Sequence, residues 1–181
     1  MKISPFEYTA NYCEENIWHL CQHPFLEADH KKVVLISNTA KNCPFYAQKS
    51  ALQTQPVWWD YHVVLLATID SVDHIYDFDS DLPFPTPLTH YLNQTFPNSE
   101  SWLSKDLPQF KIIPAVSYIN DFNSDRSHMK DSFGKWIFTP PAWPLIGTAG
   151  KLLLRDLLDF DGDRYYKRFT LNQMHLYINS Q

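Results

Sequence analysis

The sequence predicts an α+β fold in which an antiparallel sheet is built mostly from consecutive strands. An amphipathic helical segment comes first, near residue 13, and the apolar segments after it do not alternate regularly with helices. The chain has 181 residues, of which 44% are hydrophobic and 19% are charged. We therefore expect residues 1–181 to form a single domain with a sizeable core.

The first helix is defined by a capping pattern and an apolar stripe. Asn11 is the expected N-cap, with Glu14 three residues later as in a capping box. The helix should end near His23, because Pro24 disfavours helical geometry in the residue before it. The apolar stripe consists of Cys13, Ile17, Leu20 and Cys21. The thiol of Cys13 should therefore point to the same side as the core face.

Four segments predict strands and their connections. Val33–Ser37 indicates a short buried strand. Val57–Ile69 is the strongest strand pattern, and because both of its faces are largely apolar it should be central and covered on both sides. His74–Asp79 should follow as the next strand after a tight connection near Asp70 and Ser71. Phe110–Val116 indicates a third long strand.

The remaining segments give weaker patterns. The expected elements are a loop at Leu82–Pro87, a short helix at Leu88–Phe96, a structured loop at Asp121–Gly134, an extended segment at Pro140–Pro144 and a helix at Leu152–Asp159. The pattern of residues 166–178 does not distinguish helix from strand.

Composition argues against several classes of function. The net charge is −5 and no stretch is strongly basic, so binding to nucleic acid is not expected. The longest apolar stretch, Val63–Ile69, is too short to cross a membrane, and residues 1–12 lack the apolar core of a secretory signal. Three cysteines without a CxxC pair indicate neither a disulfide framework nor a zinc site. We expect a cytoplasmic monomer with no metal and no cofactor; the sequence leaves secretion without a cleavable signal open.

Cys13, His62 and Asp77 are the candidate catalytic residues. A helix N-terminus favours the thiolate form of a cysteine, a histidine can take the thiol proton, and a carboxylate can fix the histidine tautomer. On spacing alone, Cys13 is better explained as a core residue. Asp79 and Asp81 are chemically equivalent to Asp77, so residue type does not choose among the three carboxylates.

The register of the predicted hairpin determines which of these carboxylates can form a hydrogen bond with His62. If His62 lies directly opposite Asp77, the turn is centred just after Ile69. A turn centred two residues later would put Leu66 opposite Asp77, ~13 Å from His62 at ~3.3 Å per residue, which is too far for a hydrogen bond. We expect the first register, with the ring of His62 also within reach of the sulfur of Cys13.

Four separated motifs occur in the order in which a known family has them. They are Tyr12–Trp18 (YCEENIW), Trp59–Leu66 (WDYHVVLL), Ile75–Asp79 (IYDFD) with Leu82–Pro85 (LPFP), and Asp125–Trp136 (DRSHMKDSFGKW). These segments resemble the protein N-terminal glutamine amidohydrolases. The resemblance runs from about residue 8 to the chain end and is weakest after Trp136.

The resemblance implies a fold, an activity and three residue roles. The fold would be papain-like or transglutaminase-like, with the nucleophile helix packed on the antiparallel sheet. Cys13 would be the nucleophile, His62 the base and Asp77 the group that orients the histidine. The enzyme would deamidate the N-terminal glutamine of a protein or peptide through a thioester, releasing ammonia, and would require no metal or organic cofactor.

Recognition of the substrate's free terminus is not resolved by the sequence. The α-amino group is largely protonated at neutral pH, so a carboxylate or a group of carbonyls should bind it. The candidate carboxylates are Glu14, Glu15, Asp60 and Asp125. Asp125–His128 is either a loop held by its own side-chain hydrogen bonds or a wall of the substrate pocket.

Three other functions are compatible with the same residues. A deamidase of internal glutamines in a partner protein would act on targets with blocked N-termini. A papain-like protease or transglutaminase would cleave peptide bonds or incorporate amines. A binding domain that keeps the fold would lose nothing in a Cys13→Ala variant.

Overall fold

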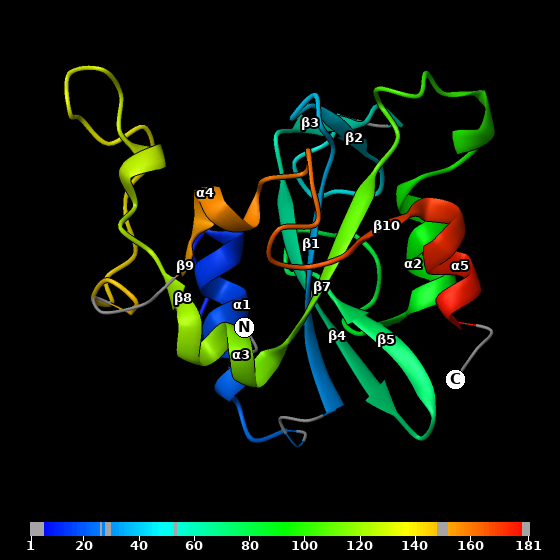
Figure 1. The fold of residues 1–181 in the computed structure, drawn as a ribbon, viewed down its shortest axis with the longest axis horizontal. Helices are drawn as coiled ribbons and strands as arrows, with labels where there is room; N and C mark the ends of the chain where they lie inside the picture. The colour runs from blue at the N-terminus through cyan, green and yellow to red at the C-terminus, as the bar shows by residue number, and fades with distance from the viewer. Residues whose placement is uncertain (1–5, 26, 28–29, 53, 148–151, 179–181) are drawn as a thin grey trace.

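The centre of the molecule is a six-stranded sheet in which every neighbouring pair is antiparallel (Figure 1). The computed structural model describes residues 6–25, 27, 30–52, 54–147 and 152–178. In spatial order the strands are β10 (Arg168–Thr170), β7 (Gln109–Pro114), β1 (Lys31–Ser37), β4 (His62–Ile69), β5 (Val72–Tyr76) and β6 (Thr86–Pro87).

Two small sheets and five α-helices complete the described fold. The small sheets are the antiparallel pair β2 (Cys43–Phe45) and β3 (Val57–Trp59) and the parallel pair β8 (Phe122–Asn123) and β9 (Leu152–Leu153). The helices are α1 (Cys13–Gln22), α2 (Leu88–Thr95), α3 (Ala115–Asp121), α4 (Leu154–Leu157) and α5 (Leu171–Ile178). The expected mixture of helices with a mainly antiparallel sheet is confirmed. No helix in the described part of the chain is long and apolar enough to cross a membrane.

The apolar core is divided by the main sheet into two layers. Helices α1, α3 and α4 cover one face, and α2 and α5 cover the other (Figure 1). Successive residues of a strand point to opposite faces, so Val63 and Leu65 of β4 join the α1 layer while Val64 and Leu66 join the α2 layer. This arrangement confirms that β4 is a central strand covered on both sides.

The start of α1 differs from the expected capping box. The N-cap is Tyr12, and no side chain caps the helix. Asn11 lies outside the helix in a left-handed conformation, with φ of 67°. Asn16 instead holds the chain before the helix, because its side-chain amide accepts from the N–H of Thr9 and donates to the carbonyl of Thr9. Glu14, which was expected to complete a capping box, is instead buried inside the molecule.

The segment Val57–Ile69 is not one strand, as the sequence pattern suggested, but two. It breaks at Asp60 and Tyr61, where β3 leaves the small sheet and β4 enters the main one. Two hydrogen bonds stabilise the break: Oδ1 of Asp60 accepts from the N–H of Tyr61, and the carbonyl of Asp60 accepts from the hydroxyl of Ser37 at the end of β1. A run of apolar residues does not reveal such a change of direction.

The hairpin between β4 and β5 turns at Asp70 and Ser71, as expected, but its register is shifted by two residues. Both turn residues have positive φ, the geometry of a two-residue hairpin turn. Ile69 pairs with Val72. The prediction that His62 and Asp77 lie directly opposite each other is therefore wrong. Strand β5 also ends at Tyr76, so Asp77 lies just beyond it rather than within a strand.

Elsewhere the element bounds agree in part with the sequence patterns. Helix α2 matches the expected helix at 88–96 to within one residue. Strand β7 ends at Pro114, and the chain turns directly into α3, which the apolar pattern of 110–116 had concealed. The helix expected at 152–159 is reduced to α4, because its first two residues form β9.

Candidate active site

A pocket of about 750 Å³ opens beside the start of α1 and the start of β4. Cys13 and His62 both line it. The structure therefore brings together two of the three candidate catalytic residues at one cavity. Asp77 lies behind His62 rather than in the wall of the pocket.

Cys13 is the first residue of α1 and is half-buried. Burial raises the pKa of its thiol well above the ordinary value, and the charge of Glu14 raises it further, while a contact with the backbone N–H of Val63 acts in the opposite direction. The sulfur lies 3.6 Å from Oε2 of Glu14. These effects oppose the expected lowering of the pKa by the helix N-terminus and outweigh it.

The other two cysteines are fully buried. All three are free thiols, as the absence of a CxxC pair indicated. Burial raises the pKa of Cys21 and of Cys43 to about 12. Cys13 is the most accessible of the three.

His62 and Asp77 form a buried hydrogen-bonded pair. The Nε2 atom of His62 lies 2.8 Å from Oδ1 of Asp77, and the two residues are 2% and 5% exposed. Continuing the register of β4 and β5 would place Asp77 opposite Val64, so His62 and Asp77 are diagonal neighbours on the same face of the sheet. Diagonal neighbours remain within reach of long side chains, which explains why the pair forms despite the shifted register.

The carboxylate of Asp77 is held by two further donors. Its Oδ1 also accepts from the N–H of Asp79 at 2.9 Å, and its Oδ2 accepts from the hydroxyl of Tyr91 at 2.8 Å. Burial alone would raise the pKa of Asp77, but the charge and hydrogen bond of His62 and these donors lower it. Burial likewise acts to lower the pKa of His62, and the charge and hydrogen bond of Asp77 overcome that effect and raise it.

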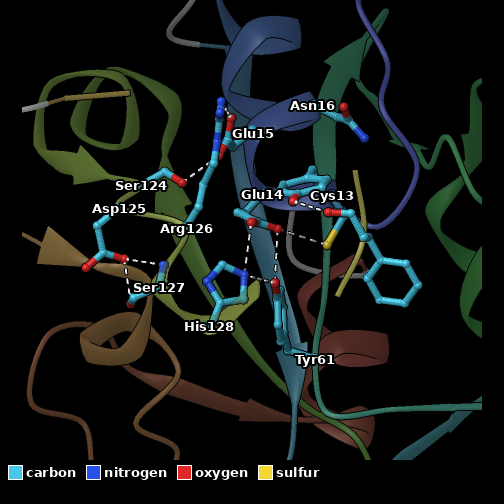
Figure 2. Close-up of polar contacts among 12 residues, drawn as sticks. Cys13, Glu14, Glu15, Asn16, Tyr61, Ser124, Asp125, Arg126, Ser127 and His128 are labelled. Carbon is cyan, nitrogen blue, oxygen red and sulfur yellow. Dashed lines mark hydrogen bonds and ion pairs between the residues drawn. The ribbon is translucent and has the colours of Figure 1, made fainter. Parts of the chain in front are cut away.

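Glu14 is a fully buried carboxylate that connects three groups around the thiol (Figure 2). Its Oε2 accepts from the hydroxyl of Tyr61 at 3.1 Å in addition to the contact with Cys13. Its Oε1 lies 3.4 Å from Nε2 of His128. Burial acts to lower the pKa of His128, but the hydrogen bond and charge of Glu14 are the main causes of a net rise. The start of α1 is thereby linked to the loop that carries His128.

The segment Asp125–His128 combines the two alternatives that its sequence left open. Oδ1 of Asp125 accepts from the N–H and the hydroxyl of Ser127 (Figure 2). Asp125, Ser127 and His128 also line the pocket. The segment is thus both a loop held by its own side chains and a wall of the cavity.

Glu15 has a structural environment that removes it from the candidates for substrate binding. It is fully buried and accepts two hydrogen bonds from Arg126, at 2.8 and 2.7 Å (Figure 2). The hydroxyl of Ser124 and the indole N–H of Trp143 donate to the same carboxylate, each at 2.6 Å. Neither Glu15 nor Glu14 is part of the pocket lining, whereas the other two candidates, Asp60 and Asp125, are.

Asp79 is a pocket residue that the sequence analysis considered only as a rival of Asp77. It lines the cavity with Cys13 and His62. Its Oδ1 accepts from the hydroxyl of Tyr8 at 2.6 Å, and burial together with this contact raises the pKa of Tyr8. The signal that could have identified it is its place at the end of the IYDFD motif, two residues after Asp77.

His62, Asp77 and Asp79 are also the one group in the described residues whose ligand atoms lie close enough to hold a metal ion, all within 4.8 Å of one another. Nε2 of His62 and both oxygens of Asp77 are already engaged in the hydrogen bonds described above. We therefore interpret the group as a hydrogen-bonded network.

Comparison with known proteins covers most of the chain. Residues 8–175 match the N-terminal glutamine amidase family. The relatives include proteins named protein N-terminal glutamine amidohydrolase from Danio rerio, Bos taurus and Homo sapiens, which are 40%, 41% and 40% identical over 160 residues. These matches cover 85% of this chain and 79%, 77% and 78% of the respective relatives. The chain therefore belongs to the N-terminal glutamine amidase family.

Proposed function

We propose that this protein hydrolyses the side-chain amide of an N-terminal glutamine, yielding an N-terminal glutamate and ammonia. The names of its relatives support the substrate. The observation that carries the chemistry is a thiol, Cys13, in the same pocket as a histidine that is hydrogen-bonded to a buried carboxylate.

In this proposal Cys13 is the nucleophile, His62 the general base and Asp77 the group that orients the histidine. The lowered pKa of Asp77 keeps it a carboxylate, so Nε2 of His62 carries a proton and donates to it. Nδ1 is then the ring nitrogen that can take a proton from the thiol. Because the pKa of Cys13 is raised, the proton has to be removed by a base as the sulfur attacks.

The reaction then proceeds in two halves. The sulfur bonds to the amide carbon, and the negative charge that develops on the amide oxygen can be bound by backbone N–H groups at the start of α1. The protonated His62 donates its proton to the departing nitrogen, so ammonia leaves and a thioester remains. A water molecule, deprotonated by the same histidine, attacks the thioester and releases glutamate and the thiol.

The arrangement of elements supports a papain-like or transglutaminase-like assignment within the α+β class. Helix α1 packs on one face of the sheet, with Cys13 as its first residue, and His62 is the first residue of the central strand β4. We propose a single catalytic domain that spans the chain.

Ammonia release from a short peptide that begins with glutamine tests the proposed function. The wild-type protein should release ammonia, and Cys13→Ala should abolish release while keeping the fold. Cys43→Ala removes a buried thiol that is not part of the pocket lining. It is the matched control and should stay active. Full activity in the Cys13→Ala protein would contradict the thiol mechanism.

Two further peptides distinguish the proposed substrate from the alternatives. A peptide that begins with asparagine should react poorly, because its side chain is one methylene shorter and misplacement by about 1 Å can cost on the order of 10²-fold in rate. N-acetylation of the glutamine peptide should remove activity. Equal rates on acetylated and free peptides would instead favour a deamidase of internal glutamines.

A further inference from the structure

Asp79 lines the pocket with Cys13 and His62, and the catalytic proposal gives it no role. We propose that Asp79 binds the α-ammonium group of the N-terminal glutamine and thereby selects substrates with a free terminus. This assignment rests on the proposed function and adds the group that recognises the chain end.

The carboxylate of Asp79 is held in place beside the reacting groups. It lines the pocket with Cys13 and His62, and one of its oxygens lies within 4.8 Å of the ligand atoms of His62 and Asp77. Its backbone N–H donates to Asp77, and its Oδ1 accepts from Tyr8. A carboxylate offers about four acceptor positions, so the contact with Tyr8 leaves room for an ammonium group.

Asp79 is not part of an ion pair among the described residues, and the ammonium of Lys49, another pocket residue, donates to the carbonyl of Phe78. The side-chain partner of Asp79, Tyr8, is an uncharged hydroxyl whose pKa is raised by burial and by Asp79 itself. A half-buried carboxylate in a pocket is stabilised by a cationic ligand.

The dimensions of glutamine limit how far the recognising carboxylate can lie from the sulfur of Cys13. Four bonds separate the α-nitrogen from the side-chain amide carbon, a span of at most about 5 Å for bonds of about 1.5 Å. Adding a charge-assisted hydrogen bond of about 2.8 Å and an attack distance of about 3 Å places the recognising carboxylate within roughly 11 Å of the sulfur. Asp79 raises the pKa of Cys13 and of His62 through its charge, which agrees with a position near both.

The other two acidic residues of the pocket face a different group. Oδ1 of Asp60 accepts from the N–H of Tyr61, and Oδ1 of Asp125 accepts from Ser127. The charges of both act on His128, whose pKa they help to raise. Asp60 and Asp125 are therefore matched controls, since each is a pocket carboxylate of the same type.

A comparison of two peptides in two proteins isolates the contact. One peptide begins with glutamine, and the other is identical except that hydrogen replaces the α-amino group. Wild-type protein should prefer the first by roughly ten- to a hundredfold in kcat/KM, the effect of one hydrogen bond to a charged group. Asp79→Asn should reduce this preference to a few-fold, whereas Asp60→Asn and Asp125→Asn should keep it.

The preference ratio separates recognition from other roles of Asp79. A residue that acted only on His62 or on folding would change the rates for both peptides equally and leave their ratio intact. If the Asp79→Asn protein turns over both peptides too slowly to measure, the dissociation constants of the two peptides are compared instead, with and without Asp79→Asn in a Cys13→Ala background. A full preference in the Asp79→Asn protein, or its loss in Asp60→Asn or Asp125→Asn, would overturn the assignment.

This outcome is distinct from failure of the proposed function. If the wild-type protein releases no ammonia from the glutamine peptide, the activity itself is wrong. If wild type is active and the ratio survives in Asp79→Asn, the activity stands and only the role of Asp79 is wrong.

Discussion

His62 is the residue whose ionisation should set the pH dependence of the reaction. Its pKa is raised above 6.5 by the charge and hydrogen bond of Asp77, which together overcome the opposing effect of burial. A base must be unprotonated to take the thiol proton, so kcat/KM should fall as the pH drops through this raised pKa. The acid limb of the pH profile should therefore lie above pH 6.5.

Asp77→Asn should change this profile in a defined direction. Without the carboxylate, burial is left to lower the pKa of His62, so the acid limb should move to lower pH. The maximal rate should fall by roughly 10²- to 10⁴-fold, because the tautomer is no longer enforced. Tyr91→Phe removes a donor to Asp77 but keeps the carboxylate, and its acid limb should stay close to that of wild type. An unmoved limb in Asp77→Asn would show that another group controls the base.

At this scale the sequence motifs predicted more than strand geometry did. The IYDFD motif identified Asp77 as the partner of His62, and their 2.8 Å contact agrees with that choice. The expected register paired the same two residues for the wrong reason, since they are diagonal rather than directly opposite neighbours. The contacts of Glu14 could not be predicted from the sequence, because Tyr61 and His128 belong to segments far from it along the chain.

The first helix is linked to the loop after β8 by the buried ion pair of Glu15 and Arg126. The pair is bidentate, and Arg126 also donates to the carbonyls of Trp143 and Pro144. Arg126→Met would leave the carboxylate of Glu15 buried without its cation. We expect a loss of roughly 3–5 kcal/mol in the free energy of unfolding at pH 7, measured by denaturant titration.

The pH dependence of that loss follows from the pKa of Glu15. Burial acts to raise it, but the hydrogen bonds from Arg126, Ser124 and Trp143 lower it below 4.5 in the folded protein. The contribution of the Glu15–Arg126 pair to the free energy of unfolding is therefore present above about pH 4.5. It disappears as the pH falls through the lowered pKa of Glu15 in the folded protein. Wild type and Arg126→Met should converge in stability below that range. Glu7→Gln alters an exposed carboxylate, 61% accessible in its contact with His19, and should change stability by no more than about 0.5 kcal/mol.

Across the whole molecule, the central strands of the main sheet were easier to predict from the sequence than the helices and short strands around them. The strands expected at 33–37, 57–69 and 110–116 overlap β1, β4 and β7, whose side chains alternate between the two core layers. A strand buried on both faces needs apolar residues at every position, and such a run is visible in the sequence.

The elements that the sequence missed are those whose direction depends on neighbours. Helix α3 begins directly after Pro114 of β7, and β3 departs from β4 at Asp60, inside runs of similar composition. Strand β10 and helix α5 come from the tail whose pattern was ambiguous, and they pack on β7 and α2. Their conformation is fixed by the core they complete, which no local pattern contains.

The buried carboxylate beside Cys13 has a consequence for the chemical lifetime of the protein. Peroxides and alkylating agents attack the thiolate, and a protonated thiol resists them. Because burial and the charge of Glu14 raise the pKa of the Cys13 thiol, we expect hydrogen peroxide at pH 7 to convert it to sulfenic acid more slowly than it does free cysteine. Glu14→Gln should accelerate that oxidation, followed by mass spectrometry after trapping, and an unchanged or slower rate would argue against the carboxylate as the protecting group. An enzyme built in this way would keep its sulfur reduced between encounters with substrate.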